Sequence, residues 1–154
     1  MTINPLSQRD ISRVTNHHAQ LDIARRFHAG LVTQDWGAIR ALLTEDAHWT
    51  LPGNNAISGT ALGADAVVER ARKIASYGLN FELLHILVSR DNVALSLHNT
   101  AQQGDRVLDE YLATVCRLKD SKIVEIETFL SDVEGMNAFF IVLVKDSKRN
   151  HNSR

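Results

Sequence analysis

The sequence has a single cysteine, almost no net charge and no long apolar run. With Cys116 alone among 154 residues, an internal disulfide and a cysteine-ligated metal site are excluded, and a reducing compartment is favoured. The formal net charge of -1 gives no electrostatic reason to expect binding to nucleic acid or to an anionic membrane. Residues 1–10 lack the apolar region of a signal peptide, and no apolar run has the length of a membrane span. We therefore expect a cytoplasmic protein with no nucleic-acid or membrane partner.

The composition is that of one globular domain. Apolar residues make up 44% of the chain and charged residues 23%, which are ordinary values for a folded protein of this length. A chain of this size buries roughly 70% of its unfolded surface and can form a core without disulfides. Both ends are polar, so we expect a flexible arm over residues 1–15 and a disordered polar tail over 145–154. A single domain over residues 16–144 lies between them.

The first half of the chain has mainly helical periodicity. Apolar residues between positions 21 and 32 recur at intervals of three and four, which predicts a long amphipathic helix. Similar spacing predicts a short helix over 36–43 and a third helix over 63–76. We expect a short strand over 47–51, between the second and third helices. The turn-forming residues 52–55 mark its end.

The second half of the chain is typical of an antiparallel meander. Four β-rich runs, at 81–89, 93–102, 107–118 and 123–132, are separated by short groups of turn-forming residues. A final short helix is expected over 133–140. Helices followed by a run of antiparallel strands indicate the α+β class.

Apolar side chains occur on both faces of the predicted sheet. This pattern indicates that both faces are covered. We expect one face to form the core and a pocket, and the other to form a homodimer interface that includes Leu95, Leu97, Ala113 and Val115. The alternative is that the outer apolar residues are scattered surface residues.

Two stretches carry a resemblance to a known family. Residues 42–49, Leu-Leu-Thr-Glu-Asp-Ala-His-Trp, resemble the segment that leads from helix to first strand in the SnoaL-like branch of the nuclear transport factor two-like superfamily. Residues 118–125, Leu-Lys-Asp-Ser-Lys-Ile-Val-Glu, resemble a hairpin of that family, with Ser121 where glycine is usual. The resemblance covers residues 18–140. It implies a curved antiparallel sheet that forms a cone, with three to four helices on its concave side around an apolar pocket.

The resemblance does not identify a reaction. This fold serves isomerases, cyclases, dehydratases, epoxide hydrolases and binding modules. The positions of the ketosteroid isomerase residues hold Phe27, Leu51 and Thr114, and the cyclase aspartate falls on Thr128. His85 lies several residues beyond the position of the dehydratase histidine. None of these catalytic sets is present intact.

The strand pattern itself suggests a polar site. The turn at residues 103–104 places His98 opposite Glu110, and the next hairpin places Glu110 opposite Asp132. Paired residues have Cβ atoms about 5 Å apart. On the inner face, His98 would act as acid or base, Glu110 would orient it, and Asp132 would tune or share the proton. The alternative is a structural pair, with His98 a satisfied buried histidine and Glu110 bonded to the backbone or to Arg106. A slip of one residue would move Glu110 to the other face.

The function that these residues favour is a cofactor-independent cyclase, isomerase or dehydratase acting on a small apolar, oxygenated substrate, with no metal. The alternative is a non-catalytic small-ligand-binding or dimerisation module. A cavity of roughly 300 Å³ or more that opens onto His98 would favour ligand chemistry or binding, and a collapsed core would favour the module. The side chains expected to line the pocket are Phe27, Trp49, Leu51, Phe81, Leu83, His85, Ser96, Thr100, Leu112, Thr114 and Thr128.

Overall fold

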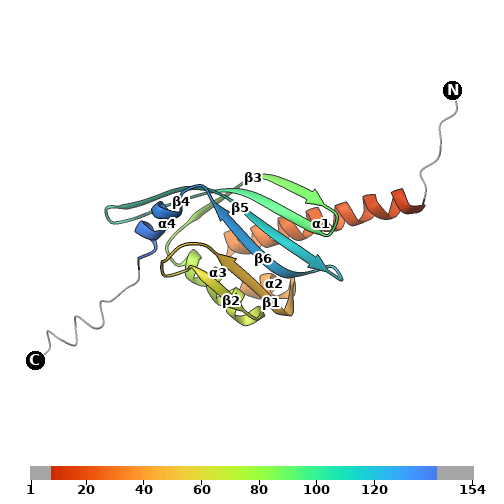
Figure 1. Cartoon of the computed structure of the whole chain (residues 1–154), viewed down its shortest axis with the longest axis horizontal. Helices are drawn as coiled ribbons and strands as arrows, with labels where there is room; N and C mark the ends of the chain where they lie inside the picture. Colours follow the sequence, from red (N-terminus) through yellow and green to blue (C-terminus); the bar gives the residue numbers. More distant parts are fainter. Residues whose placement is uncertain (1–7, 142–154) are drawn as a thin grey trace, which may run out of the picture.

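A computed structural model describes the backbone of residues 8–141 and the side chains from residue 17 onward. The chain forms four helices and a six-stranded sheet (Figure 1). In chain order the elements are α1 (Gln8–Thr33), α2 (Trp36–Ala41), β1 (Leu43–Leu51), β2 (Gly59–Leu62), α3 (Ala64–Ala75), β3 (Asn80–Ser89), β4 (Asn92–Gln103), β5 (Arg106–Lys119), β6 (Lys122–Leu130) and α4 (Val133–Phe139). The predicted α+β class is confirmed. None of the helices in the described part is long and apolar enough to cross a membrane.

Helix α1 begins earlier than the sequence predicted. It starts at Gln8 and so includes residues 8–15, which we expected to form a flexible arm. Residues 8–18 are mostly polar but contain neither proline nor glycine, so nothing interrupts a helix that the following residues anchor to the sheet. Figure 1 shows this first part of α1 extending beyond the sheet. The expected tail over 145–154 lies outside the described residues.

The sheet is curved and unclosed, with the strand order β2-β1-β6-β5-β4-β3. Four neighbouring pairs are antiparallel, but β1 and β6 are parallel. The expected antiparallel sheet is therefore mixed at this one pair. The chain leaves β1 through β2 and α3, crosses to the far edge, and returns by three hairpin turns, so β6 arrives beside β1 in the same direction.

Helices α1 and α3 pack against the sheet and supply about a third of the buried core. The buried residues of α1 (Ile23, Ala24, Phe27, Leu31) follow helical spacing and lie against β3 and β4. Those of α3 do the same against β1 and β2; they are Ala64, Val67, Val68, Ala71, Ile74 and Ala75. These stripes explain why both segments are helical, because each helix can bury one apolar face.

The β4 strand shows which residues face inward. Val93, Leu95, Leu97 and Asn99 are buried, and the residues between them point to the outer face. The expectation that Leu95 and Leu97 belong to an outer interface is therefore wrong. Burying a leucine side chain stabilises the fold by about 1.5–3 kcal/mol, so the inner face takes the more apolar of the two alternating sets.

The same alternation places three predicted site residues on the outer face. Ser96, His98 and Thr100 lie between the buried positions of β4, and Asn99, not His98, is the partner of Glu110. Residues Gly104 and Asp105 form a two-residue turn between Gln103 and Arg106, which are paired. The predicted register was one residue off, and such a shift exchanges the two faces of a strand.

Candidate functional site

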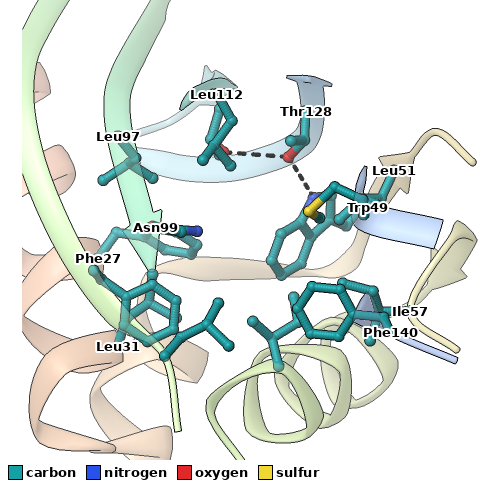
Figure 2. Close-up of a pocket in the computed structure, with 15 residues that line it drawn as sticks. Phe27, Leu31, Trp49, Leu51, Ile57, Leu97, Asn99, Leu112, Thr128 and Phe140 are labelled. Atoms are coloured by element: carbon teal, nitrogen blue, oxygen red, sulfur yellow. Dashed lines mark hydrogen bonds between the residues drawn. The ribbon is translucent and has the colours of Figure 1, made fainter. Parts of the chain in front are cut away.

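The concave side of the sheet encloses a small apolar space that we call the core cavity (Figure 2). Its enclosed volume is about 30 Å³. The lining side chains come from the sheet, from α1, α3 and α4, and from the loops between elements: Phe27, Leu31, Trp49, Leu51, Ile57, Ile74, Leu79, Phe81, Leu97, Asn99, Leu112, Thr114, Thr128, Met136 and Phe140. A space of this size holds about one water molecule, so the side chains nearly fill the cone.

Seven of the predicted pocket residues line this cavity. They are Phe27, Trp49, Leu51, Phe81, Leu112, Thr114 and Thr128. Leu83 packs against the core without lining the cavity. Like Ser96 and Thr100, His85 lies on the outer face, where it pairs with Ser96; a bulge at Leu84 sets this register. The expectation that these three polar residues line the pocket is wrong, because alternate positions carry the apolar side chains that fill the core.

One wall of the cavity has a short chain of hydrogen bonds. Trp49 Nε1 donates to Thr128 Oγ1 at 2.9 Å, and the hydroxyl oxygens of Thr128 and Thr114 are 3.2 Å apart. The Trp49 ring meets Phe27 edge to face, with centroids 6.4 Å apart. On its other side Arg70 donates to the Trp49 carbonyl oxygen at 2.6 Å. These contacts hold the indole in one orientation.

The opposite wall has a buried amide with an unpaired oxygen. Asn99 is 6% exposed, and its Oδ1 has no hydrogen-bond partner among the residues that the structure describes. Figure 2 shows the nitrogen end of the Asn99 amide directed across the cavity, toward Trp49. Leaving a buried polar atom unpaired costs about 1–3 kcal/mol, so such an atom calls for a partner, which can be a ligand or an ordered water.

Among the described residues, those that line the cavity have no ionisable side chain. His98 lies instead on the outer face, with Nε2 2.6 Å from Asp109 Oδ1 and Nδ1 3.5 Å from Glu82 Oε1. Its ring stacks on Tyr111, with centroids 4.2 Å apart. The hydrogen bond to Asp109 raises the pKa of His98, and Glu82 adds to this effect.

Glu110 and Asp132 are close together, but their role is to fix the start of α4 and not to share a proton with His98. Glu110 is buried, and its Oε1 accepts hydrogen bonds from Asp132 N at 2.8 Å and from Ser131 Oγ at 3.1 Å. The Asp132 side chain caps α4 by accepting from Gly135 N at 2.9 Å. The predicted proton-sharing line from His98 through Glu110 to Asp132 is therefore wrong. The observed register differs from the predicted one by one residue, so His98 lies on the opposite face of the sheet from Glu110. Glu110 accepts a hydrogen bond from the backbone, as in the alternative of a purely structural role.

Helix α4 and the loop over residues 52–58 close one side of the cavity. Asn137 Oδ1 accepts hydrogen bonds from Asn54 N and from Asn55 Nδ2, both at 2.8 Å. Ala56 N donates to the Phe140 carbonyl oxygen at 2.8 Å. These bonds join the loop to the helix, which places Ile57, Met136 and Phe140 in the lining. Sequence reasoning missed these three residues and also Leu31, Ile74, Leu79, Leu97 and Asn99. The apolar alternation at positions 93, 95 and 97 could have placed Asn99 on the inner face.

Within the described part of the chain, no group of three His, Cys, Asp or Glu side chains could hold a metal ion. The chemistry available at the core cavity is therefore shape, apolar contact and hydrogen bonding.

Comparison with known proteins agrees with this architecture. Two solved structures are similar to the chain: Bal32a from a soil-derived mobile gene cassette (25% identity, TM-score 0.76, covering 80% of this chain and 97% of that one) and a Xanthomonas campestris protein of unknown function with a cystatin-like fold (27%, TM-score 0.72, 80% and 98%). TerC, co-crystallised with polyporic acid, shares the fold at 15% identity (TM-score 0.69, 79% and 98%). No curated protein matches the chain.

The family model for the SnoaL-like domain matches residues 24–126, more than half of the chain. The matched segment contains β1 to β5, α3 and most of β6. The chain therefore belongs to the SnoaL-like domain family.

Proposed function

We propose that this protein is a non-catalytic binding domain that takes a small, largely apolar molecule into the core cavity. The observation that supports it is the buried Asn99 amide, whose Oδ1 has no partner within the described residues although the surrounding wall is apolar. A ligand with a hydrogen-bond donor would satisfy this oxygen.

Acid–base catalysis in this cavity has little support. A general acid or base must come within hydrogen-bond reach of the proton that it transfers. The lining provides an amide, an indole and two hydroxyls, none of which exchanges protons readily near neutral pH. Members of this fold include enzymes and binding modules alike, so the lining chemistry decides between the two, and it favours binding over a cyclase, isomerase or dehydratase.

The ligand-free cavity has to widen before it can bind. About 30 Å³ is far below the roughly 150 Å³ that accepts a benzene ring. We expect the wall made by α4 and residues 52–58 to move, because its two halves are separate segments joined to each other by three hydrogen bonds. The start of α4 stays fixed by Glu110. We expect a ligand to replace contacts of Phe140 and Met136 with its own.

The test is a methyl-NMR titration of the purified protein with toluene, indole, cyclohexanone and benzamide. We expect at least one probe to shift the methyl signals of Leu97 and Leu112 in a saturable way, and to remain chemically unchanged after prolonged incubation. Saturable binding also raises Tm by mass action. If none of these probes perturbs the core methyls, or if a probe is converted, the proposal is wrong.

We also propose that two copies pair through the outer face of the sheet. Leu87, Tyr111 and Phe129 lie on this face and are 66%, 54% and 53% exposed. Two charge pairs of the face, His98–Asp109 and Arg117–Glu125, are satisfied within one copy, whereas Glu82 and Glu127 add negative charge to it. Pairing of two identical faces would cover the apolar side chains at the cost of bringing these carboxylates closer together.

Sedimentation equilibrium of the full chain tests this pairing. We expect a dimer for the wild type and a monomer for Phe129→Lys, because a lysine at an apolar contact would have to be desolvated. Val32→Lys is the matched control, since Val32 is 55% exposed on α1, away from the sheet face. A monomeric wild type would refute the pairing and leave the ligand proposal intact.

A further inference from the structure

The side-chain donors around Trp49 outnumber the hydrogen bonds that connect them. Trp49, Thr114 and Thr128 have one side-chain donor each, and two hydrogen bonds connect the three groups. If Thr128 donates to Thr114, the Thr114 hydroxyl hydrogen remains; if Thr114 donates to Thr128, the Thr128 hydrogen remains. In either case one hydroxyl hydrogen has no acceptor within this group, so this wall can donate to a ligand.

Asn99 offers a different combination. A carboxamide presents an acceptor oxygen beside a donor nitrogen, and here the oxygen is buried without a partner in the described part of the chain. The facing residue on β5, Glu110, does not supply one: it is itself an acceptor, and its Oε1 is bonded to Ser131 and Asp132. The Asn99 position is therefore complementary to a group that has a donor and an acceptor side by side.

The charge of the ligand follows from the same lining. A buried carboxylate needs a cation or several donors to offset its lost hydration, and a buried ammonium group needs an anion. In the part of the chain that the structure describes, the lining of the core cavity has no charged side chain of either sign. Arg70, the cation next to Trp49, donates to the carbonyl oxygens of Trp49 and Ser58 and does not line the cavity.

We infer that the ligand of the core cavity is a neutral molecule whose polar end is a carboxamide, a lactam or a similar donor–acceptor pair. This inference rests on the proposed binding function. The N–H group of the ligand donates to Asn99 Oδ1, and the Asn99 amide nitrogen donates to the carbonyl oxygen of the ligand. The apolar body lies between Phe27, Leu31 and Trp49, which line the cavity on the helix side and on β1. A second acceptor on the ligand would take the remaining threonine hydroxyl hydrogen.

Three probes built on one ring separate these requirements. Benzamide is neutral with a donor and an acceptor, benzoate has nearly the same shape but is charged, and toluene has no polar group. Each is titrated against the wild type, Asn99→Leu and Thr100→Val, with core methyl shifts as the measurement. Thr100→Val is the matched control, since its side chain is on the outer face next to Asn99.

We expect the wild type and Thr100→Val to bind benzamide about tenfold more tightly than benzoate or toluene. Asn99→Leu should lose this preference and bind toluene at least as well as benzamide. Asn99→Ala removes the same amide while leaving more space, and it should also lose the preference, which covers the case that the leucine does not fit.

The inference is wrong if the wild type binds all three probes equally, or if both Asn99 variants keep the preference for benzamide. Neither result contradicts the proposed binding function. Tighter binding of benzoate than of benzamide also overturns the inference, because the cavity would then hold a charge. If none of the three probes binds, and indole and cyclohexanone fail as well, the proposed function itself is wrong.

Discussion

His98 and Asp109 form a short contact on the outer face of the sheet, with Nε2 2.6 Å from Oδ1. Glu82 approaches the other ring nitrogen at 3.5 Å, and Tyr111 covers one face of the ring. The carboxylate of Asp109 raises the pKa of His98, because it stabilises the protonated ring. A pKa raised in the folded state gives a stabilisation that is fully present below the unfolded value of about 6.5 and is lost as the pH rises through the folded pKa.

The first prediction follows from this pair. An NMR titration of the imidazole signals should give His98 a pKa above the ordinary value, and Asp109→Asn should lower it. Glu127→Gln is the control, since Glu127 lies on the same face but on β6. Equal His98 pKa values in the wild type and Asp109→Asn would contradict the assigned cause.

The second prediction concerns the buried carboxylate of Glu110. Glu110→Leu leaves Asp132 N and Ser131 Oγ without their acceptor at the start of α4. We expect the free energy of unfolding to fall by about 1–3 kcal/mol, as measured by urea denaturation. Glu110→Gln should lose less, because its amide oxygen can still accept. Glu134→Leu, at an exposed site in the first turn of α4, should leave the free energy of unfolding nearly unchanged. A loss as large as that of Glu110→Leu would argue against a specific role of the Glu110 hydrogen bonds in holding α4.

The third prediction concerns Gln20, which fixes α1 to the β3–β4 turn. Its Nε2 lies 2.7, 3.0 and 2.9 Å from the carbonyl oxygens of Ser89, Arg90 and Asn92. Gln20→Leu should destabilise the fold by about 1 kcal/mol and speed hydrogen exchange at the amides of residues 89–92. The control, Gln102→Leu, changes an exposed glutamine that bonds to the carbonyl oxygen of Gly104. Unchanged exchange at the β3–β4 turn in Gln20→Leu would refute this anchoring role.

The fourth prediction concerns the closure of the core cavity. Asn137→Ala removes the acceptor that Asn54 N and Asn55 Nδ2 share. We expect a loss of about 1–2 kcal/mol in stability and faster exchange at residues 54–56. The rate at which a probe associates with the core cavity should also increase, since the wall made by α4 and residues 52–58 opens more often. Asn80→Ala, at an exposed position at the start of β3, is the control. A slower rate of probe association in Asn137→Ala would contradict the proposal that this wall moves to admit the ligand.

The sequence predicted well those elements that depend on residues close together in the chain. The helical spacing of residues 63–76 and the turn groups between the β-rich runs predicted α3 and the β3–β6 hairpins to within a few residues. Each of these features depends on neighbours in the chain, and periodicity reports them directly.

The face of a strand was harder to predict, because one residue decides it. The Gly104–Asp105 turn pairs His98 with Tyr111, one position away from the expected partner Glu110. In β4 the inner set, Val93, Leu95 and Leu97, is more apolar than the outer set, and this contrast was the better guide. The spacing of one histidine and two acids favoured the other register, which the structure does not have.

The closing wall of the core cavity could not be read from local pattern at all. Asn137 bonds to residues 82 and 83 positions earlier in the chain. Nothing in the sequence near residue 137 or near residue 54 indicates that the two segments meet. Such contacts come from the packing of the complete fold, which the periodicity of single elements does not describe.

The parallel pairing of β1 with β6 has a consequence for how the protein is made. Leu43 pairs with Ile123, so β1 can complete its pairing only after β6, the last strand of the described chain, has left the ribosome. Until then both β1 and β5 present open backbone edges, and such edges recruit other chains. We therefore expect nascent or truncated forms that end before residue 122 to aggregate or to engage chaperones during synthesis, and the complete chain to fold slowly for its size.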